Sequence, residues 1–153
     1  MKIKLIVLFI LPLLLGSLSS LFTVEAITSW YNYSNKPWFN PPNWIFGPVW
    51  TLLYLLMGLA SCLVFKTEHT LKGKAMILYF IQLGLNFLWS FIFFYLREPG
   101  WAFVEIILLW VFINSTIIYF SKISRLAAYV MLPYVIWVSF AAILNYYHYI
   151  LNA

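Results

Sequence analysis

The sequence predicts an all-α membrane protein, a bundle of five transmembrane helices. Of its 153 residues, 65% are hydrophobic and only 8% are charged, whereas a typical soluble domain has about 25% charged residues. Because a membrane-spanning helix needs about 20 mostly apolar residues, the chain has room for five such helices but not for a second domain. We therefore expect one transmembrane domain over residues 1–153, with helices at about 3–25, 45–65, 75–96, 100–120 and 125–150.

The first apolar segment, 3–25, resembles a signal peptide, because it has a basic start and Val24-Glu25-Ala26 as a possible cleavage site. Its apolar run is longer than the roughly 7–15 residues of a signal-peptide core. This length favours a helix that stays in the protein. Gly16 and Ser20 are four residues apart and would allow a second helix to pack closely against it.

Residues 27–43, here called the aromatic loop, differ in composition from the rest of the chain. They include Trp30, Tyr31, Trp38, several asparagines and three prolines. Connections of this length are uncommon and often functional. The aromatic side chains either anchor the loop at the membrane interface or form a lid over a cavity.

The later helices are separated by short breaks. Pro48 lies in the first turn of the helix at 45–65, where a missing backbone donor costs nothing because those donors lack helical partners. The remaining connections are polar or contain helix breakers, and they fall at residues 66–74, 98–100 and 121–124.

The basic residues are distributed unequally between the two sides that five spans define. Seven of the nine lie on the side of the N-terminus: Lys2, Lys4, Lys66, Lys72, Lys74, Lys122 and Arg125. The other side has Lys36 and Arg97. Basic residues concentrate in cytoplasmic loops, so we expect a cytoplasmic N-terminus, with the aromatic loop and the C-terminus outside. This pattern explains the net charge of +5 without nucleic-acid binding.

Catalytic and metal-binding patterns are not found in the sequence. Cys62 is the only cysteine, and no histidines, cysteines or carboxylates have the spacing of a metal site. Neither a serine-hydrolase signature nor a glycine-rich phosphate loop occurs. We interpret Glu25, Glu105 and His148 as interfacial residues, because they lie near the ends of predicted helices.

Three predicted helices each have a face that combines aromatic, small and polar residues. Helical spacing brings together Gln82, Asn86, Trp89 and Ser90; Gly47, Trp50, Tyr54 and Gly58; and Tyr134, Trp137, Ala141 and Asn145. Amides are costly in lipid unless they are paired, so these faces should turn inward. The amides either only join the helices or, together with the tryptophans, form a pocket for a flat, largely apolar ligand.

Three long segments resemble the translocator protein family, also called tryptophan-rich sensory proteins or peripheral-type benzodiazepine receptors. They are KPWFNPPNWIFGPVWTLLYLLMG at 36–58, QLGLNFLWSFIFF at 82–94 and LPYVIWVSFAAILNYYHYILN at 132–152. The resemblance extends over nearly the whole chain in the family's order, and the basic N-terminus looks like that of a bacterial member. It implies a multi-pass protein of the bacterial inner membrane and a homodimer.

The resemblance further implies binding of protoporphyrin IX and of synthetic isoquinoline carboxamide or benzodiazepine-type drugs, with no separate cofactor and no metal. By motif match the pocket residues would be Trp50, Asn86, Trp89, Ser90, Trp137 and Ala141, with Tyr31 and Pro41 in the lid. Tyr54 belongs to the same face as Trp50. The pocket would open toward the aromatic loop.

Three functions remain open on this basis: a tetrapyrrole sensor or carrier, an enzyme-like protein that degrades porphyrin with light and oxygen, and a secondary transporter. In the second case Trp50 and Trp137 would be the redox-active residues. The third is weakest, because no inverted repeat is visible. The cholesterol motif of animal relatives is incomplete, since Leu144 and Tyr146 are not followed by Lys or Arg, so cholesterol is a doubtful ligand.

Overall fold

A computed structural model describes residues 1–153, and all of its regular structure is helical. The elements are α1 (Lys2–Thr28), α2 (Trp30–Tyr33), α3 (Asn43–Lys66), α4 (Lys72–Ser90), the π-helical η1 (Phe91–Tyr95), α5 (Pro99–Ile123) and α6 (Arg125–Asn152). Five helices are long and apolar enough to cross a membrane: α1, α3, α4 continued by η1, α5 and α6. The predicted fold class, an all-α membrane protein with five spans, is confirmed.

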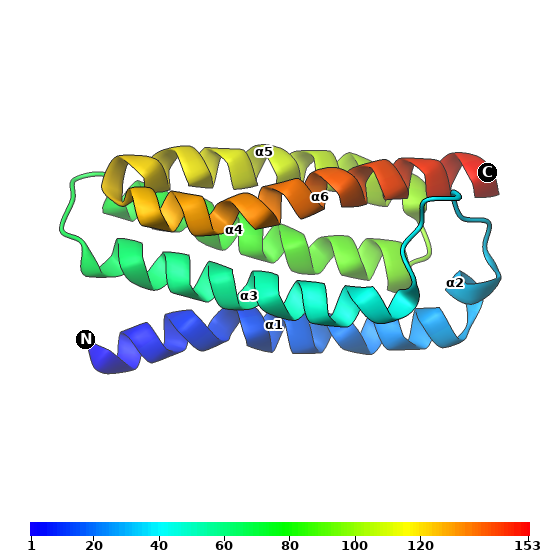
Figure 1. Cartoon of the computed structure of the whole chain (residues 1–153), viewed down its shortest axis with the longest axis horizontal. Coiled ribbons are helices and arrows are strands. Elements are labelled where there is room, and N and C mark those ends of the chain that lie inside the picture. The colour runs from blue at the N-terminus through cyan, green and yellow to red at the C-terminus, as the bar shows by residue number, and fades with distance from the viewer.

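The five long helices lie side by side and alternate in direction (Figure 1). Each packs on its neighbours in the order α1, α3, α6, α5, α4, and α4 with η1 returns to α1. The core between α3, α4, α5 and α6 contains fully buried aromatic and aliphatic side chains, such as Met57, Tyr79, Ile106 and Tyr134. Helix α1 is mostly exposed, as expected for a helix on the lipid-facing side.

Glycines allow α1 and α3 to approach closely. A Cβ atom at Gly58 would lie 2.5 Å from the carbonyl oxygen of Phe9, and one at Gly16 would overlap the ring of Tyr54. The close packing expected around Gly16 therefore involves α3. These contacts hold α1 and α3 together from Phe9 to the middle of α1, and Figure 1 shows the two helices side by side.

Several boundaries differ from the sequence expectation. Helix α1 continues to Thr28, so the residues of the possible cleavage site lie within a helix. The aromatic loop contains the short helix α2 and then crosses the end of the bundle as an extended segment (Figure 1). The third span ends in the π-helical turn η1, a rare geometry that is frequent at functional sites.

Two residues predicted at the interface are buried instead. Glu105 is 7% exposed, and neither of its carboxyl oxygens has a hydrogen-bond partner. His148 is 4% exposed. Their burial was not predicted, because proximity to a helix end does not decide which side of the helix a residue occupies. Both residues lie on faces that turn toward neighbouring helices.

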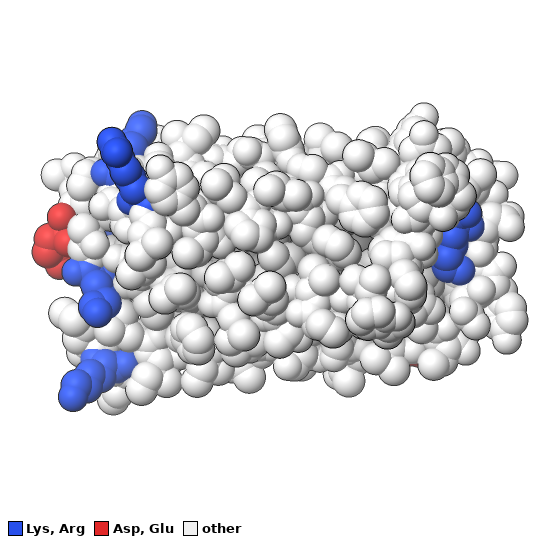
Figure 2. Space-filling model, in the orientation of Figure 1, with Lys and Arg blue, Asp and Glu red and all other residues white.

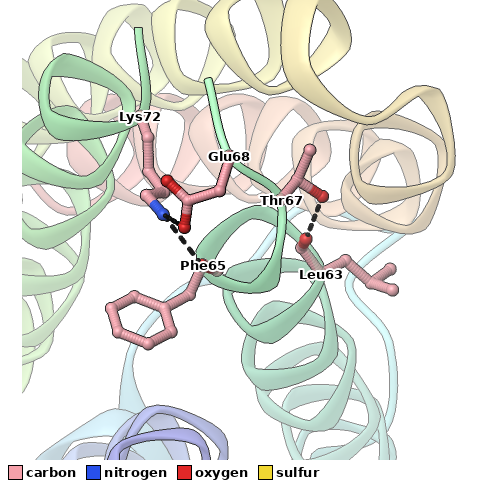
Figure 3. A network of polar contacts seen from close by, with 5 residues as sticks. All are labelled: Leu63, Phe65, Thr67, Glu68 and Lys72. Atoms are coloured by element: carbon pink, nitrogen blue, oxygen red, sulfur yellow. Dashed lines mark hydrogen bonds and ion pairs between the residues drawn. The ribbon is translucent and has the colours of Figure 1, made fainter. Parts of the chain in front are cut away.

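Charged side chains are concentrated at the two ends of the bundle. Figure 2 shows most Lys and Arg side chains at the end that contains the N-terminus, and a smaller basic patch at the opposite end. At the first end, the Lys72 ammonium group donates to the carbonyl of Phe65 (3.3 Å) and to Glu68 (3.0 Å), while Thr67 donates to Leu63 (2.9 Å) (Figure 3). These bonds satisfy carbonyls at the end of α3 that have no helical partner.

Candidate functional site

A cavity of about 320 Å³ lies between α1, α3, the α4–η1 junction and α6, and below the aromatic loop. Helix α1 contributes small and hydroxyl side chains: Gly16, Ser17, Ser19, Ser20 and Thr23. The other elements contribute mainly aromatic residues: Tyr31, Phe46, Trp50, Tyr54, Trp89, Phe93, Phe94, Trp137 and His148. The wall formed by α1 therefore consists mainly of small and polar side chains, and the remaining walls are mainly aromatic.

A hydrogen-bonded network of amides and phenols lies directly behind Tyr54. The Tyr54 hydroxyl donates to Asn86 Oδ1 (3.0 Å), and Asn86 Nδ2 donates to the Tyr134 hydroxyl (2.8 Å). Tyr134 in turn donates to Gln82 Oε1 (2.8 Å). All four side chains are buried. The network joins α3, α4 and α6. Asn86 and Gln82 therefore connect helices, which is one of the two roles that the sequence left open for these amides.

The tryptophans of the cavity are held in different ways. Trp89 donates from its indole to Asn145 Oδ1 (2.9 Å), and Asn145 donates to the carbonyl of Pro99 (2.8 Å). Trp50 stacks on Tyr54 with ring centres 5.6 Å apart. The indole N–H of Trp137 is buried and has no partner in the protein, and the same holds for the hydroxyl of Ser19. Buried polar groups without partners are rare, so these two are candidate contacts for a ligand.

The aromatic loop forms an ordered roof over the cavity. Tyr31 stacks parallel to His148 with ring centres 5.4 Å apart, and the ammonium group of Lys36 lies 4.7 Å from the Tyr31 ring centre. Burial raises the pKa of the Tyr31 hydroxyl, and partial burial lowers the pKa of Lys36. Two hydrogen bonds tie the loop to α6. The backbone N–H of Asn35 donates to Asn152 Oδ1 (2.9 Å), and Asn152 Nδ2 donates to the carbonyl of Asn35 (2.8 Å).

The cavity opens sideways between α1 and α3. Only four of its lining residues are exposed, namely Ser17, Ser20, Gly47 and Thr51. They lie on α1 and α3, which indicates an opening on the side of the bundle. The family resemblance had implied an opening toward the aromatic loop instead.

The structure brings most of the predicted site residues to this one cavity: Tyr31, Trp50, Tyr54, Trp89, Ser90, Trp137 and Ala141. Asn86 does not reach the cavity surface, because Tyr54 covers it and takes up its carbonyl oxygen. Pro41 also lies outside the lining, whereas its neighbour Asn40 contributes to it. Sequence reasoning missed His148 and the hydroxyl face of α1. The spacing of Gly16, Ser20 and Thr23 along one side of the helix could have indicated that face.

These features define a multi-pass α-helical membrane protein with an internal cavity that has aromatic walls. The chain belongs to the TspO/MBR family, whose sequence model matches residues 8–150. It is 40% identical over 151 residues to the tryptophan-rich protein TspO of Archaeoglobus fulgidus, covering 99% of this chain and 98% of that protein.

Two further relatives show how widely this sequence pattern occurs. The tryptophan-rich protein TspO of Chlorobaculum tepidum is 40% identical over 138 residues, covering 89% of this chain and 87% of that protein. The translocator protein of Homo sapiens is 41% identical over 120 residues, covering 76% of this chain and 71% of that protein. The predicted membership of the translocator protein family is thus confirmed.

Proposed function

We propose that this protein is a membrane tetrapyrrole-binding protein, a sensor or carrier, that takes up protoporphyrin IX in the aromatic cavity. The observation that carries the proposal is a cavity with aromatic walls and two unpartnered polar groups, Trp137 Nε1 and Ser19 Oγ. A flat aromatic ligand gains from stacking and burial against such walls. Isoquinoline carboxamide and benzodiazepine-type drugs, which are also flat and apolar, would occupy the same cavity.

The side opening would allow a ligand larger than the cavity to bind, because part of the ligand could extend through it. The volume of about 320 Å³ is at the lower end of the range of about 300–1,000 Å³ found for small-molecule pockets. A macrocycle would therefore extend into the gap between α1 and α3. There the hydroxyl groups of Ser17, Ser20 and Thr51 donate to backbone carbonyls of their own helices and keep their oxygen lone pairs free to accept. An apolar ligand dissolved in the membrane could enter by this gap without crossing water.

Binding is tested by titrating the purified protein with protoporphyrin IX and following the porphyrin absorbance. Replacing Trp50 and Trp137 by Phe removes indole contacts and two N–H groups, including the unpartnered N–H of Trp137. Aromatic contacts contribute about 0.5–1.5 kcal/mol each, so we expect a loss of roughly 1–3 kcal/mol, about 5- to 150-fold in affinity. The matched control replaces Trp44 and Trp101, which are 74% and 69% exposed. Equal affinities of both double variants would refute the site.

A second candidate function is light- and oxygen-dependent degradation of the bound porphyrin. It is favoured by the contact of Trp50 with two tyrosines, Tyr54 (5.6 Å between ring centres) and Tyr134 (6.4 Å). Such electron-rich rings suit a reaction in which the porphyrin supplies the photochemistry and the protein supplies orientation. Illumination in air should convert the porphyrin into a discrete product, and Trp137→Phe should abolish this. Unspecific bleaching at the rate seen in detergent alone would reject the enzyme-like function.

We also propose that the N-terminus is cytoplasmic and that the aromatic loop and C-terminus lie outside, in a bacterial inner membrane. The unequal basic residues at the two ends support this orientation. Alkaline phosphatase fused after Ala153 should be active in a bacterial host, and an inactive fusion would reverse the orientation. A homodimer, which the resemblance implies, would find room for close packing at Gly84, whose surroundings are open.

A further inference from the structure

His148 lies in the roof of the cavity. The sequence motifs did not indicate it as a ligand contact. It is near the end of α6, and only 4% of its surface is exposed. His148 also belongs to the residues that line the cavity. The other histidine, His69, lies exposed in the connection between α3 and α4, at the opposite end of the bundle.

The imidazole ring of His148 is held by aromatic neighbours. It stacks on Tyr31 with an angle of 3° between the ring planes and a centre distance of 5.4 Å. The rings of Trp30 (5.8 Å) and Phe93 (5.1 Å) meet it edge to face. Packing of this kind fixes the orientation of the ring without using its nitrogen atoms.

Both ring nitrogens are free of protein partners. No hydrogen bond of the protein involves the His148 side chain, although its backbone carbonyl accepts one from Asn152. The nitrogens are also not among the fully buried polar atoms that lack a partner, so they keep some accessible surface. The only ion pair of the protein joins Lys72 and Glu68, so no carboxylate holds this imidazole in its charged form. A neutral imidazole has a nitrogen lone pair available for a metal.

We propose that His148 is the axial ligand of a metallated tetrapyrrole, such as an iron or zinc porphyrin, bound in this cavity. The inference rests on the proposed function and adds to it a contact that only porphyrins carrying a metal can make. The chain has no cluster of three metal-ligating side chains. A metal already held by four macrocycle nitrogens needs only an axial ligand, and imidazole is the common axial ligand of haem iron.

The coordination is tested with the purified full-length chain, iron(III) protoporphyrin IX and free-base protoporphyrin IX. The wild-type protein should bind both and give the iron porphyrin the absorption spectrum of an imidazole complex. His148→Ala should lose that spectrum and weaken binding of the iron porphyrin at least about tenfold, since removing even an outer partner of a metal ligand costs about 10- to 100-fold. Its affinity for the free base should change by less than about twofold, because the free base has no metal to coordinate.

Added imidazole should restore the spectrum of His148→Ala by entering the space that the substitution leaves. His148→Phe keeps the aromatic packing but has no nitrogen, so it should behave like the alanine variant and serves if that variant does not fold. His69→Ala is the matched control and should behave as the wild type.

An iron spectrum that is unchanged in both His148 variants would overturn the inference alone. Equal weakening of both porphyrins in His148→Phe would assign the residue to packing and would also overturn it. Failure of the wild-type protein to bind either porphyrin would overturn the proposed function, and the inference with it.

Discussion

Replacing Tyr134 by Phe tests whether the amide network behind the cavity holds α3, α4 and α6 together. The hydroxyl of Tyr134 accepts from Asn86 (2.8 Å) and donates to Gln82 (2.8 Å). The side chain is fully buried. The substitution therefore removes two short bonds and leaves an amide N–H and an amide oxygen without these partners, while the ring can keep its packing.

The expected magnitude follows from the number of bonds and from their surroundings. Hydrogen bonds between membrane helices contribute about 0.6 kcal/mol on average and up to about 1.7 kcal/mol. Two such bonds give a loss of roughly 1–3 kcal/mol for Tyr134→Phe. Gln82 cannot compensate well, because its other contact is a 3.9 Å approach to the sulfur of Met57.

Tyr79→Phe is the matched control. Tyr79 is equally buried, but its hydroxyl makes one bond, at 3.3 Å, to the backbone carbonyl of Met57. We expect a loss below about 1 kcal/mol for this variant. Unfolding of both purified variants in mixed micelles with increasing denaturing detergent measures the difference. A loss for Tyr79→Phe equal to or greater than that for Tyr134→Phe would refute the role assigned to the network.

Two further predictions concern the α1–α3 boundary and the route of ligand entry. Gly58→Ala should destabilise the fold by about 1–3 kcal/mol in the same detergent assay, because its Cβ would meet the Phe9 backbone, whereas Gly84→Ala has open space and should stabilise α4 by up to about 1 kcal/mol. Asn152→Ala frees the aromatic loop from α6 and should change the association rate of protoporphyrin IX, measured by stopped flow, by less than about twofold. Thr51→Trp at the side opening should slow association. Faster association in Asn152→Ala together with an unchanged rate in Thr51→Trp would identify the loop as the entrance.

The five spans and the aromatic walls could be predicted because each depends on a strong local pattern. Membrane spans follow from long apolar runs with few charges, and Trp50, Trp89 and Trp137 follow from the helical spacing of large aromatic and polar residues. The position of Asn86 could not be predicted in the same way. Spacing tells which face of α4 it occupies, but only the packing of the other helices decides that tyrosine hydroxyls come between it and the cavity.

The cavity-lining face of α1 and the position of His148 escaped prediction for a different physical reason. In water, a buried helical face differs from an exposed one in polarity, whereas in lipid both faces are apolar, so the sequence of α1 contains little contrast between them. Its serines and threonine are weak signals, because hydroxyl groups in helices can bond to backbone carbonyls one turn earlier, as Ser17 does with Leu13 (2.8 Å). For His148, the distance from the helix end was informative about depth but not about direction.

The side opening and the roof together restrict how a ligand can be exchanged. The roof is anchored to α6 through α2, by the stacking of Tyr31 on His148, and at the start of its extended part, by the bonds between Asn35 and Asn152. Moving it would break all of these contacts at once, whereas the rim at Ser20 and Thr51 makes no contact that must be broken for entry. An apolar ligand already concentrates in the bilayer, so the side route needs neither dehydration of the ligand nor opening of the roof. In the proposed binding mode, the contacts of the ordered roof hold the imidazole in place.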